Sequence, residues 1–222
     1  MSGARLPYRD RREAGRVLAE RLAHLQGHED LLVLALPRGG VAVGFEVARA
    51  LHSELDVFVV RKLGMPGHEE FAIGAIASSG VQVMNDMRGW NVSERAVQEI
   101  AARERKELER REWMYRDGRP PIHVEGRTVI VVDDGLATGA TMRAAVASLR
   151  KLRPDHLVVG VPVGSAESCK QLKAEADEVV CAAMPFPFRA VGEWYRDFPQ
   201  AGDEEVRELL AEARTEHEQP AH

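Results

Sequence analysis

Two adjacent carboxylates at the end of an apolar run offer the most specific chemistry in this chain. Asp133 and Asp134 follow an apolar run and precede a loop of small residues with two threonines, in the order VIVVDDGLATGAT over 129–141. Such a run is typical of a strand buried on both faces, and in an open α/β sheet ligands bind beyond the carboxyl ends of such strands. The loop opens a predicted helix, whose first amide groups lack partners within the helix and favour an anion. The segment therefore predicts a ligand site whose loop holds a phosphate.

The two carboxylates need a different partner from the phosphate, because like charges repel. Carboxylate oxygens accept hydrogen bonds, so they could bind the vicinal hydroxyls of a ribose, or hold Mg²⁺ directly or through water. A phosphate beside a diol indicates a ribose 5-phosphate. The chain has no GxGxxG motif, and no Gly-Lys-Ser/Thr follows these glycines, so neither of the usual nucleotide-binding loops is present.

Alternating strand and helix patterns position this loop. Apolar runs predict strands over 31–36, 55–60, 128–132, 157–163 and 178–182. Amphipathic or charged stretches predict helices over 10–26, 41–51, 93–116, from the 133–141 loop to about 151, between the last two strands, and over 203–213. Residues 61–70 read as a polar loop, and 71–77 with 81–84 as a hairpin projecting from the sheet. The alternation predicts an α/β fold, with a central, mostly parallel sheet flanked by helices and right-handed crossovers.

Length and composition exclude several classes of protein. The 222 residues include 30 basic and 35 acidic side chains, a formal net charge of −5, so binding of nucleic acid by bulk charge is not expected. We expect one domain over 1–222. The two cysteines, Cys169 and Cys181, form no metal-binding or disulfide pattern. No apolar stretch is long enough for a membrane span and the N-terminus has no signal core, so we expect a cytoplasmic protein.

The segment VVDDGLATGATM resembles the phosphoribosyl pyrophosphate (PRPP) signature of type I phosphoribosyltransferases, and most closely the adenine phosphoribosyltransferase version. The resemblance is strongest over about 30–165, and as a whole the chain looks like a bacterial phosphoribosyltransferase group with RGG, RKLG and EFAIGA segments. The resemblance implies the type I fold, with a small hood at about 183–200 and a mobile loop. It implies that Asp133 and Asp134 bind the ribose, with Mg²⁺ as cofactor. It also implies that the 5-phosphate is held by Ala137, Thr138, Gly139, Ala140 and Thr141. Hypoxanthine-guanine enzymes have an Asp where this chain has Ala137, so a 6-oxopurine substrate is in doubt.

The same resemblance assigns the pyrophosphate side of the site. The loop PRGG, from Pro37 through Arg38, Gly39 and Gly40, falls where the family binds pyrophosphate, commonly with a non-proline cis peptide. Glycines allow close backbone approach, and Arg38 supplies a cationic fork; the alternative is an ordinary strand-to-helix turn.

Arg61 and Lys62 fall where the family has pyrophosphate-contacting cations, at the root of a mobile loop over 63–70. In that loop Glu70, with Glu69 and His68, is a candidate acid or base. The alternative is that these are ordinary exposed polar residues.

Aromatic residues concentrate near the C-terminus, where a short stretch holds Phe186, Phe188, Trp194, Tyr195 and Phe198. They could close a hydrophobic cap over the sheet. Alternatively they resemble the hood of type I enzymes, where an aromatic ring stacks on the base, and Val191, Gly192 and Trp194 are then the candidate base contacts.

The implied reaction displaces pyrophosphate from C1 of PRPP with a nitrogenous base or other nitrogen acceptor, as in nucleotide salvage. The alternative is a regulator of the same fold that binds PRPP without turnover, or binds RNA. The expected partners are small molecules, and neither a membrane nor nucleic acid. A homodimer through the N-terminal and charged helices is left open, because type I enzymes are often dimers.

Overall fold

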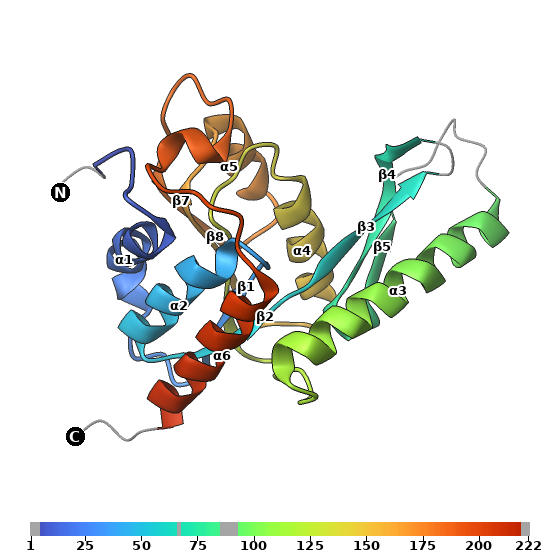
Figure 1. The fold of residues 1–222 in the computed structure, drawn as a ribbon, viewed down its shortest axis with the longest axis horizontal. Helices are drawn as coiled ribbons and strands as arrows, with labels where there is room; N and C mark the ends of the chain where they lie inside the picture. Colours follow the sequence, from blue (N-terminus) through green and yellow to red (C-terminus); the bar gives the residue numbers. More distant parts are fainter. Residues whose placement is uncertain (1–4, 66–67, 85–92, 219–222) are drawn as a thin grey trace.

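A parallel five-stranded sheet forms the centre of the protein in the computed structural model, which describes residues 5–65, 68–84 and 93–218 (Figure 1). The strands lie in the order β2-β1-β6-β7-β8, and every neighbouring pair is parallel. Their bounds are Leu31–Ala35 for β1, Glu54–Val57 for β2, Thr128–Val132 for β6, His156–Val163 for β7 and Glu178–Ala183 for β8. The predicted α/β class and parallel sheet are thus confirmed.

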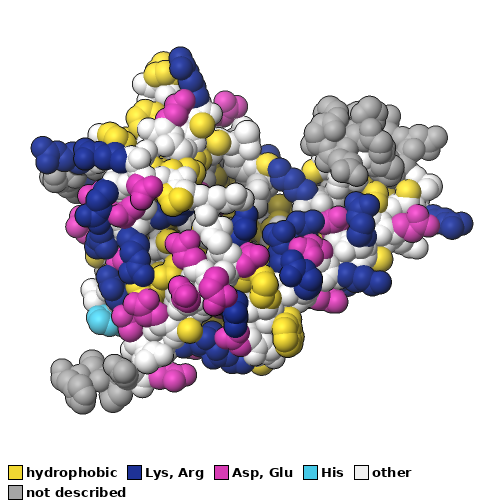
Figure 2. All heavy atoms as spheres, in the orientation of Figure 1, with side chains coloured by type: hydrophobic (Ala, Val, Ile, Leu, Met, Phe, Trp, Pro, Cys, Tyr) yellow, Lys and Arg dark blue, Asp and Glu magenta, His cyan; other side chains and the backbone are white. Residues whose placement is uncertain are grey.

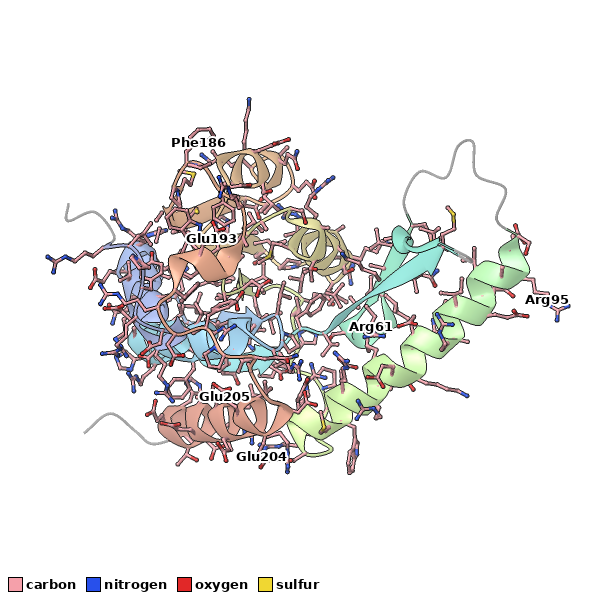
Figure 3. All side chains as sticks on the ribbon, turned by 45° about the horizontal axis from the view of Figure 1, so that its top comes forward. Arg61, Arg95, Phe186, Glu193, Glu204 and Glu205 are labelled. Carbon is pink, nitrogen blue, oxygen red and sulfur yellow. The ribbon has the colours of Figure 1, made fainter. Side chains whose placement is uncertain are left out.

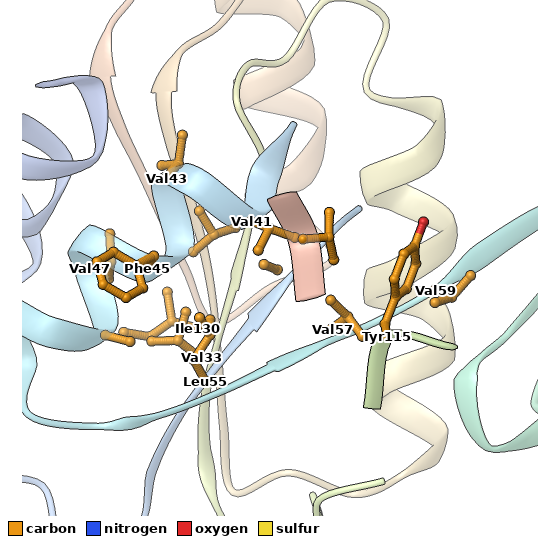
Figure 4. Close-up of a cluster of buried hydrophobic side chains, with 14 of the residues drawn as sticks. Val33, Val41, Val43, Phe45, Val47, Leu55, Val57, Val59, Tyr115 and Ile130 are labelled. Carbon is orange, nitrogen blue, oxygen red and sulfur yellow. The ribbon is translucent and has the colours of Figure 1, made fainter. Parts of the chain in front are cut away.

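Helices cover both faces of this sheet (Figure 1). On one face lie α1 (Arg11–Leu22, continued by a 3-10 turn over Ala23–Leu25), α2 (Gly40–Leu51) and α6 (Asp203–Glu218); on the other lie α4 (Ala140–Lys151) and α5 (Ala166–Leu172). Each face of the sheet carries a hydrophobic core, and alternate residues of each central strand point into one core or the other. The strands therefore read as continuous apolar runs in the sequence. Figure 4 shows the first core, where Val33, Leu55 and Ile130 of the sheet lie under Phe45 and Val47 of α2.

An antiparallel arm extends from the sheet (Figure 1). Its strands are β3 (Val60–Met65), β4 (His68–Ala77) and β5 (Gln82–Met84), with a 3-10 turn over Ser78–Gly80, and helix α3 (Glu94–Arg116) packs along it. The predicted hairpin and charged helix are confirmed. The prediction of a polar loop over 61–70 is wrong, because most of it forms β3 and the start of β4. Leu63 and Met65 alternate with more exposed residues, but Gly64 and the register shifts beside it obscured that period in the sequence.

The prediction of a strand over 55–60 is also wrong at its C-terminal end. β2 stops at Val57, and Val60 already pairs with Ala77 in the arm. A buried ion pair fixes this junction: Arg116 of α3 donates from Nε to both carboxylate oxygens of Asp56 (3.0 and 2.8 Å) and from Nη2 to the Val57 carbonyl (2.9 Å). Both side chains are more than nine-tenths buried, so the pair ties β2 to the arm.

The hood joins two distant parts of the chain. Residues 183–200, with a 3-10 turn over Val191–Trp194 (η3), pack against the segment that precedes α1. The Tyr8 amide donates to the Trp194 carbonyl (2.9 Å), and the Arg196 amide donates to the Tyr8 carbonyl (2.8 Å). The Tyr8 side chain is fully buried and donates to the Pro162 carbonyl (2.8 Å). The N-terminal segment is therefore part of the hood.

Across the described ranges, no helix combines the length and apolar character that a membrane span requires. In the view of Figure 2, basic and acidic side chains are interspersed over the surface.

Candidate functional site

The PRGG loop and the acidic pair meet where the order of the strands reverses. β1 leads outward to β2, whereas β6 leads the other way to β7 and β8, so β1 and β6 flank the switch point of the sheet. Ala35 pairs with Val132, and each strand ends there. The loops after these two strands must therefore share one edge of the sheet, as the sequence predicts.

The contact between the two loops is closer than any side chain would allow. A Cβ built on Gly39 would lie 2.0 Å from Oδ2 of Asp134, and one on Gly40 would lie 2.8 Å from the Val132 carbonyl oxygen. Gly40 is thus required for the backbones to approach each other, whereas a Cβ on Gly39 would displace the Asp134 carboxylate. The Pro37–Arg38 peptide is cis, as the resemblance implies for this loop.

Arg38 stands at the start of α2 beside the N-terminus of α6. Its Nη1 lies 3.9 Å from Oδ1 of Asp203, and about a third of the side chain is exposed. Tyr115 holds the same Asp203 oxygen through its hydroxyl (2.6 Å). The contact between Arg38 and Asp203 is thus a long ionic one, and the guanidinium can reorient toward an anion in the loop.

The two carboxyls carry an electrostatic cost. Burial raises the pKa of Asp133 well above its usual range, and the neighbouring Asp134 charge raises it further. Burial also raises the pKa of Asp134, and the Arg11 guanidinium opposes that shift. The Asp134 amide donates to Oδ1 of Asp133 (2.8 Å), which orients that carboxyl. A buried acidic pair with raised pKa values is typical of a functional site, because it costs stability.

Arg11 is a residue of this site that the sequence did not reveal. Its Nε donates to Oδ2 of Asp134 (2.8 Å), and its Nη1 donates to the Pro199 carbonyl (2.7 Å). The guanidinium carbon lies 3.8 Å from the centre of the Phe198 ring, and the side chain is 11% exposed. One sequence signal could have found it: a cation in the first turn of a helix opposes the helix dipole, which indicates another role.

The predicted phosphate loop is held from outside by the turn between β7 and α5. The hydroxyls of Ser165 and Ser168 both donate to the Ala137 carbonyl (3.0 and 2.6 Å). Gly139 has a φ of 72°, which favours glycine, and caps α4. The first amides of α4, from Ala140 and Thr141 onward, are those without partners within the helix. Ala137 to Thr141 thus form a supported turn that ends at a helix N-terminus.

The aromatic residues of the hood form a small apolar cluster over the end of β7. Tyr195 stacks on Phe198 with ring centres 4.8 Å apart, and Phe188 faces Trp194 at 6.1 Å. This arrangement matches the hydrophobic-cap interpretation. Phe186 is the exception, because it is 96% exposed and projects from the outer end of the hood (Figure 3).

The hood also reaches the acidic loop. The Tyr195 hydroxyl donates to the Asp134 carbonyl (2.5 Å), and a Cβ on Gly135 would lie 2.5 Å from Val191. The indole Nε1 of Trp194 is buried and finds no hydrogen-bond partner among the described residues. Gly192 lies against Phe198. The predicted base contacts Val191, Gly192 and Trp194 are thus brought to the edge of the site.

The arm residues are placed differently from the sequence expectation. Arg61 lies in β3 and donates to Oε2 of Glu104 on α3 through Nε (2.9 Å) and Nη2 (2.6 Å), so its side chain faces α3 (Figure 3). Lys62 is exposed on β3. Glu70 lies in β4, but its side chain, like those of His68 and Glu69, lies outside the described part of the structure. The acidic pair, the PRGG loop and the phosphate turn are brought together, whereas Arg61 is tied to the arm.

Comparisons with known proteins agree with this geometry. The family model "Phosphoribosyl transferase domain" matches residues 10–193, so the chain belongs to the phosphoribosyl transferase domain family. A Mycobacterium tuberculosis protein named "Putative phosphoribosyl transferase Rv0571c" is 47% identical over 206 residues, which is 92% of this chain and 46% of that protein. The chain thus spans about half the length of the curated relatives that it matches.

Solved structures show the same fold. The crystal structure of TT1426 from Thermus thermophilus is 47% identical with a TM-score of 0.83, and the match covers 93% of this chain and 99% of that one. A hypothetical protein from Neisseria gonorrhoeae with bound ppGpp shares the fold with a TM-score of 0.50 and 14% identity, over 96% of this chain and 99% of that one.

Proposed function

We propose that the protein is a phosphoribosyltransferase that binds PRPP with Mg²⁺ and transfers its ribose 5-phosphate to a nitrogen acceptor, with release of pyrophosphate. The observation that carries this proposal is the close packing of the PRGG loop on the acidic pair, where Gly39 leaves no room for a Cβ beside Asp134. A ligand with hydroxyls for the carboxylates and an anionic group for the glycine backbone would span both loops. PRPP has both groups, on adjacent parts of one molecule.

The three parts of PRPP fit three parts of the site. The 5-phosphate would bind the turn from Ala137 to Thr141, where the amides at the start of α4 attract an anion. The ribose hydroxyls would donate to Asp133 and Asp134. The pyrophosphate would lie against the PRGG backbone, with Arg38 as its cation.

The donor set fits Mg²⁺ only in part. Carboxylate oxygens are hard ligands that suit Mg²⁺, and Asp133 and Asp134 would hold the ion directly or through water. Within the described ranges, no three His, Cys, Asp or Glu side chains are grouped as a metal site. The ion would therefore arrive with PRPP, and it would supply positive charge that stabilises the departing pyrophosphate.

The chain's own residues account for the remaining steps. The bond from C1 to the pyrophosphate oxygen breaks, the acceptor nitrogen bonds to C1 and loses a proton, and positive charge develops on the ribose. The carboxylates of Asp133 and Asp134 anchor the ribose and balance that charge. Arg38 and the PRGG amides stabilise the charge of the leaving group, and Lys62 and Glu70 remain the candidate cation and acid or base that the arm would bring.

The acceptor would bind between the phosphate turn and the hood. A cavity of about 380 Å³ lies there, lined by Ala137, Thr138, Ser165, Ser168, Phe188 and Arg189 among others. Phe188 could stack on a flat heterocycle, and the buried Nε1 of Trp194 behind it is a donor that still lacks a partner among the described residues. The candidate base contacts Val191, Gly192 and Trp194 do not line this cavity, and Val191 lies against Gly135 instead. A nitrogen heterocycle held by these three residues would therefore bind on the acidic-loop side of the hood.

One observation favours the second candidate, a regulator that binds PRPP without turnover. Arg61 is held by Glu104 on α3, so in this structure its guanidinium is not directed to the PRGG loop as a pyrophosphate contact.

A single assay separates the two functions. The protein would be incubated with PRPP and Mg²⁺, and pyrophosphate release would be measured with a panel of purines, pyrimidines and small amines, with the double variant Asp133→Asn, Asp134→Asn as the control. Release that depends on one acceptor and is lost in the double variant supports the enzyme. Binding of PRPP without release for any acceptor supports the regulator, and no binding of PRPP refutes both.

A further inference from the structure

The first turn of α1 places Arg11 with unusual rigidity for a residue near the N-terminus. Asp10 caps the helix, because its carboxylate accepts from the Glu13 amide (2.8 Å). Immediately before the cap, the backbone of Tyr8 and Arg9 is hydrogen-bonded to the hood at Trp194, Arg196 and Asp197. The backbone of Arg11 is therefore fixed by both the helix and the hood.

The guanidinium of Arg11 is fixed as well. It donates to Asp134 through Nε and to the Pro199 carbonyl through Nη1, and one face lies on the Phe198 ring. A lysine could not make these three contacts together, because its ammonium is a point charge without a planar face. By contrast, Arg16 on the same helix is 45% exposed and reaches Glu46, which also pairs with Arg12 and Arg49.

The charge of Arg11 acts on the groups that would bind the ribose. The charged and titratable groups that face Asp134 are Arg11 from α1, Asp133 from the preceding position and Tyr195 from the hood. Among these, Arg11 alone is a cation, and its charge lowers the pKa of both carboxyls against the effect of burial. Because the guanidinium is fixed against Oδ2, it balances the negative charge of the acidic pair and determines which oxygen of Asp134 is left to accept from a hydroxyl.

We propose that Arg11 is a positioning residue of the ribose site, which orients and charge-balances the Asp134 carboxylate and links its position to the hood. The proposal rests on the proposed binding of PRPP. Nε of Arg11 donates to Oδ2 of Asp134, which leaves Oδ1 of the same carboxylate to accept from the ribose. The ring of Phe198 and the Pro199 carbonyl hold the guanidinium from the hood, so a movement of the hood would move the acid. The N-terminal helix thus contributes to the ligand site through a contact 123 residues apart in the chain.

The test compares Arg11→Gln and Arg11→Lys with the matched control Arg16→Gln, which makes the same change of charge on the same helix. Binding of PRPP and of pyrophosphate, each with Mg²⁺, would be measured by calorimetry at neutral pH, because pyrophosphate has no ribose to meet Asp134. For Arg11→Gln we expect PRPP affinity at neutral pH to fall by about 10- to 100-fold, as for loss of a charge-assisted hydrogen bond. The affinity for pyrophosphate should stay that of the wild type, because pyrophosphate has no hydroxyls that donate to Asp134. The PRPP affinity of Arg11→Lys should lie between those of Arg11→Gln and the wild type, and the PRPP affinity of Arg16→Gln should equal that of the wild type.

Thermal unfolding of each variant separates positioning from folding, because a purely structural role would lower the melting temperature and weaken the binding of PRPP and of pyrophosphate alike. If Arg11→Gln does not fold, Arg11→Lys carries the test through its affinity for PRPP relative to that for pyrophosphate. Wild-type affinity for PRPP in both Arg11 variants would overturn the proposal, and so would equal losses for PRPP and pyrophosphate. Tighter binding of PRPP would also overturn it, because Arg11 would then be competing with the ribose. If the wild type itself does not bind PRPP, the proposed function fails, and this inference fails with it.

Discussion

Substitution of Gly39 by alanine tests the contact between the two loops with the smallest possible change. Its φ of −59° and ψ of −36° suit alanine, so the backbone itself is not strained by the change. The new Cβ would lie 2.0 Å from Oδ2 of Asp134, and real Cβ atoms essentially never come closer than 3.0 Å to another heavy atom. The contact must therefore open by at least 1.0 Å, the difference between these two distances.

Either way of opening it damages the site. If the Asp134 carboxylate rotates, it leaves Arg11, whose Nε is 2.8 Å away; if the loop moves, the PRGG backbone shifts relative to the acids. Loss of a hydrogen bond to a charged group costs about 1.5 to 3 kcal/mol, or about 10- to 160-fold in affinity at about 1.36 kcal/mol per tenfold. We expect a loss of that order in PRPP affinity for Gly39→Ala, measured by calorimetric titration with Mg²⁺.

The matched control is Gly202→Ala, because a Cβ on Gly202 meets nothing within 4 Å and its φ is not in the left-handed region. This variant should bind PRPP as the wild type does. Thermal unfolding should show both variants folded. Wild-type affinity in a folded Gly39→Ala protein would refute the reasoning, since the two loops would then not act as one site.

Three further predictions concern stability and the acceptor. Asp133→Asn should raise the melting temperature, because the side-chain oxygen can still accept from the Asp134 amide while the cost of burying a charge and the repulsion between the acids are removed. The same variant should abolish PRPP binding, and an unchanged or lower melting temperature would contradict the reasoning. Arg116→Met should lower the free energy of unfolding by about 3 to 5 kcal/mol in denaturant titrations, because it leaves the buried Asp56 carboxylate without its partner. The control Arg110→Met breaks an exposed pair and should lower it by less than about 1 kcal/mol; equal losses would show that the buried pair does not fix the junction between β2 and the arm. Trp194→Phe keeps an aromatic ring but removes the buried donor, so acceptor affinity should fall about tenfold with PRPP affinity unchanged, and equal losses of both would make Trp194 a packing residue.

The parallel sheet and the acidic loop could be predicted because their signals are local. Strands buried on both faces, such as Val129 to Val132, leave a continuous apolar run, and the acids and small residues follow it directly. The meeting of the PRGG loop with the acids follows from topology, because neighbouring parallel strands end at the same edge.

The arm and the hood could not be predicted in the same way, because their contacts are not local. Lys62, Gly64 and the register shifts make β3 read as a loop, and the strand is defined by its pairing with β4 and by α3 against it. Tyr8 belongs to the hood through hydrogen bonds to residues more than 180 positions later. Arg11 reads as one basic residue among several in a charged helix, and only the folded chain shows that it reaches Asp134.

The central claim is that the loops after β1 and β6 form one site for PRPP. The most direct measurement is calorimetric titration of the wild-type protein with PRPP, with and without Mg²⁺, and with ribose 5-phosphate as the control ligand. The account predicts saturable binding of PRPP that strengthens with Mg²⁺, and weaker binding of ribose 5-phosphate, which lacks the group that faces the PRGG loop. Equal affinity for both ligands would contradict the role of the PRGG loop, and absence of binding for both would contradict the site itself.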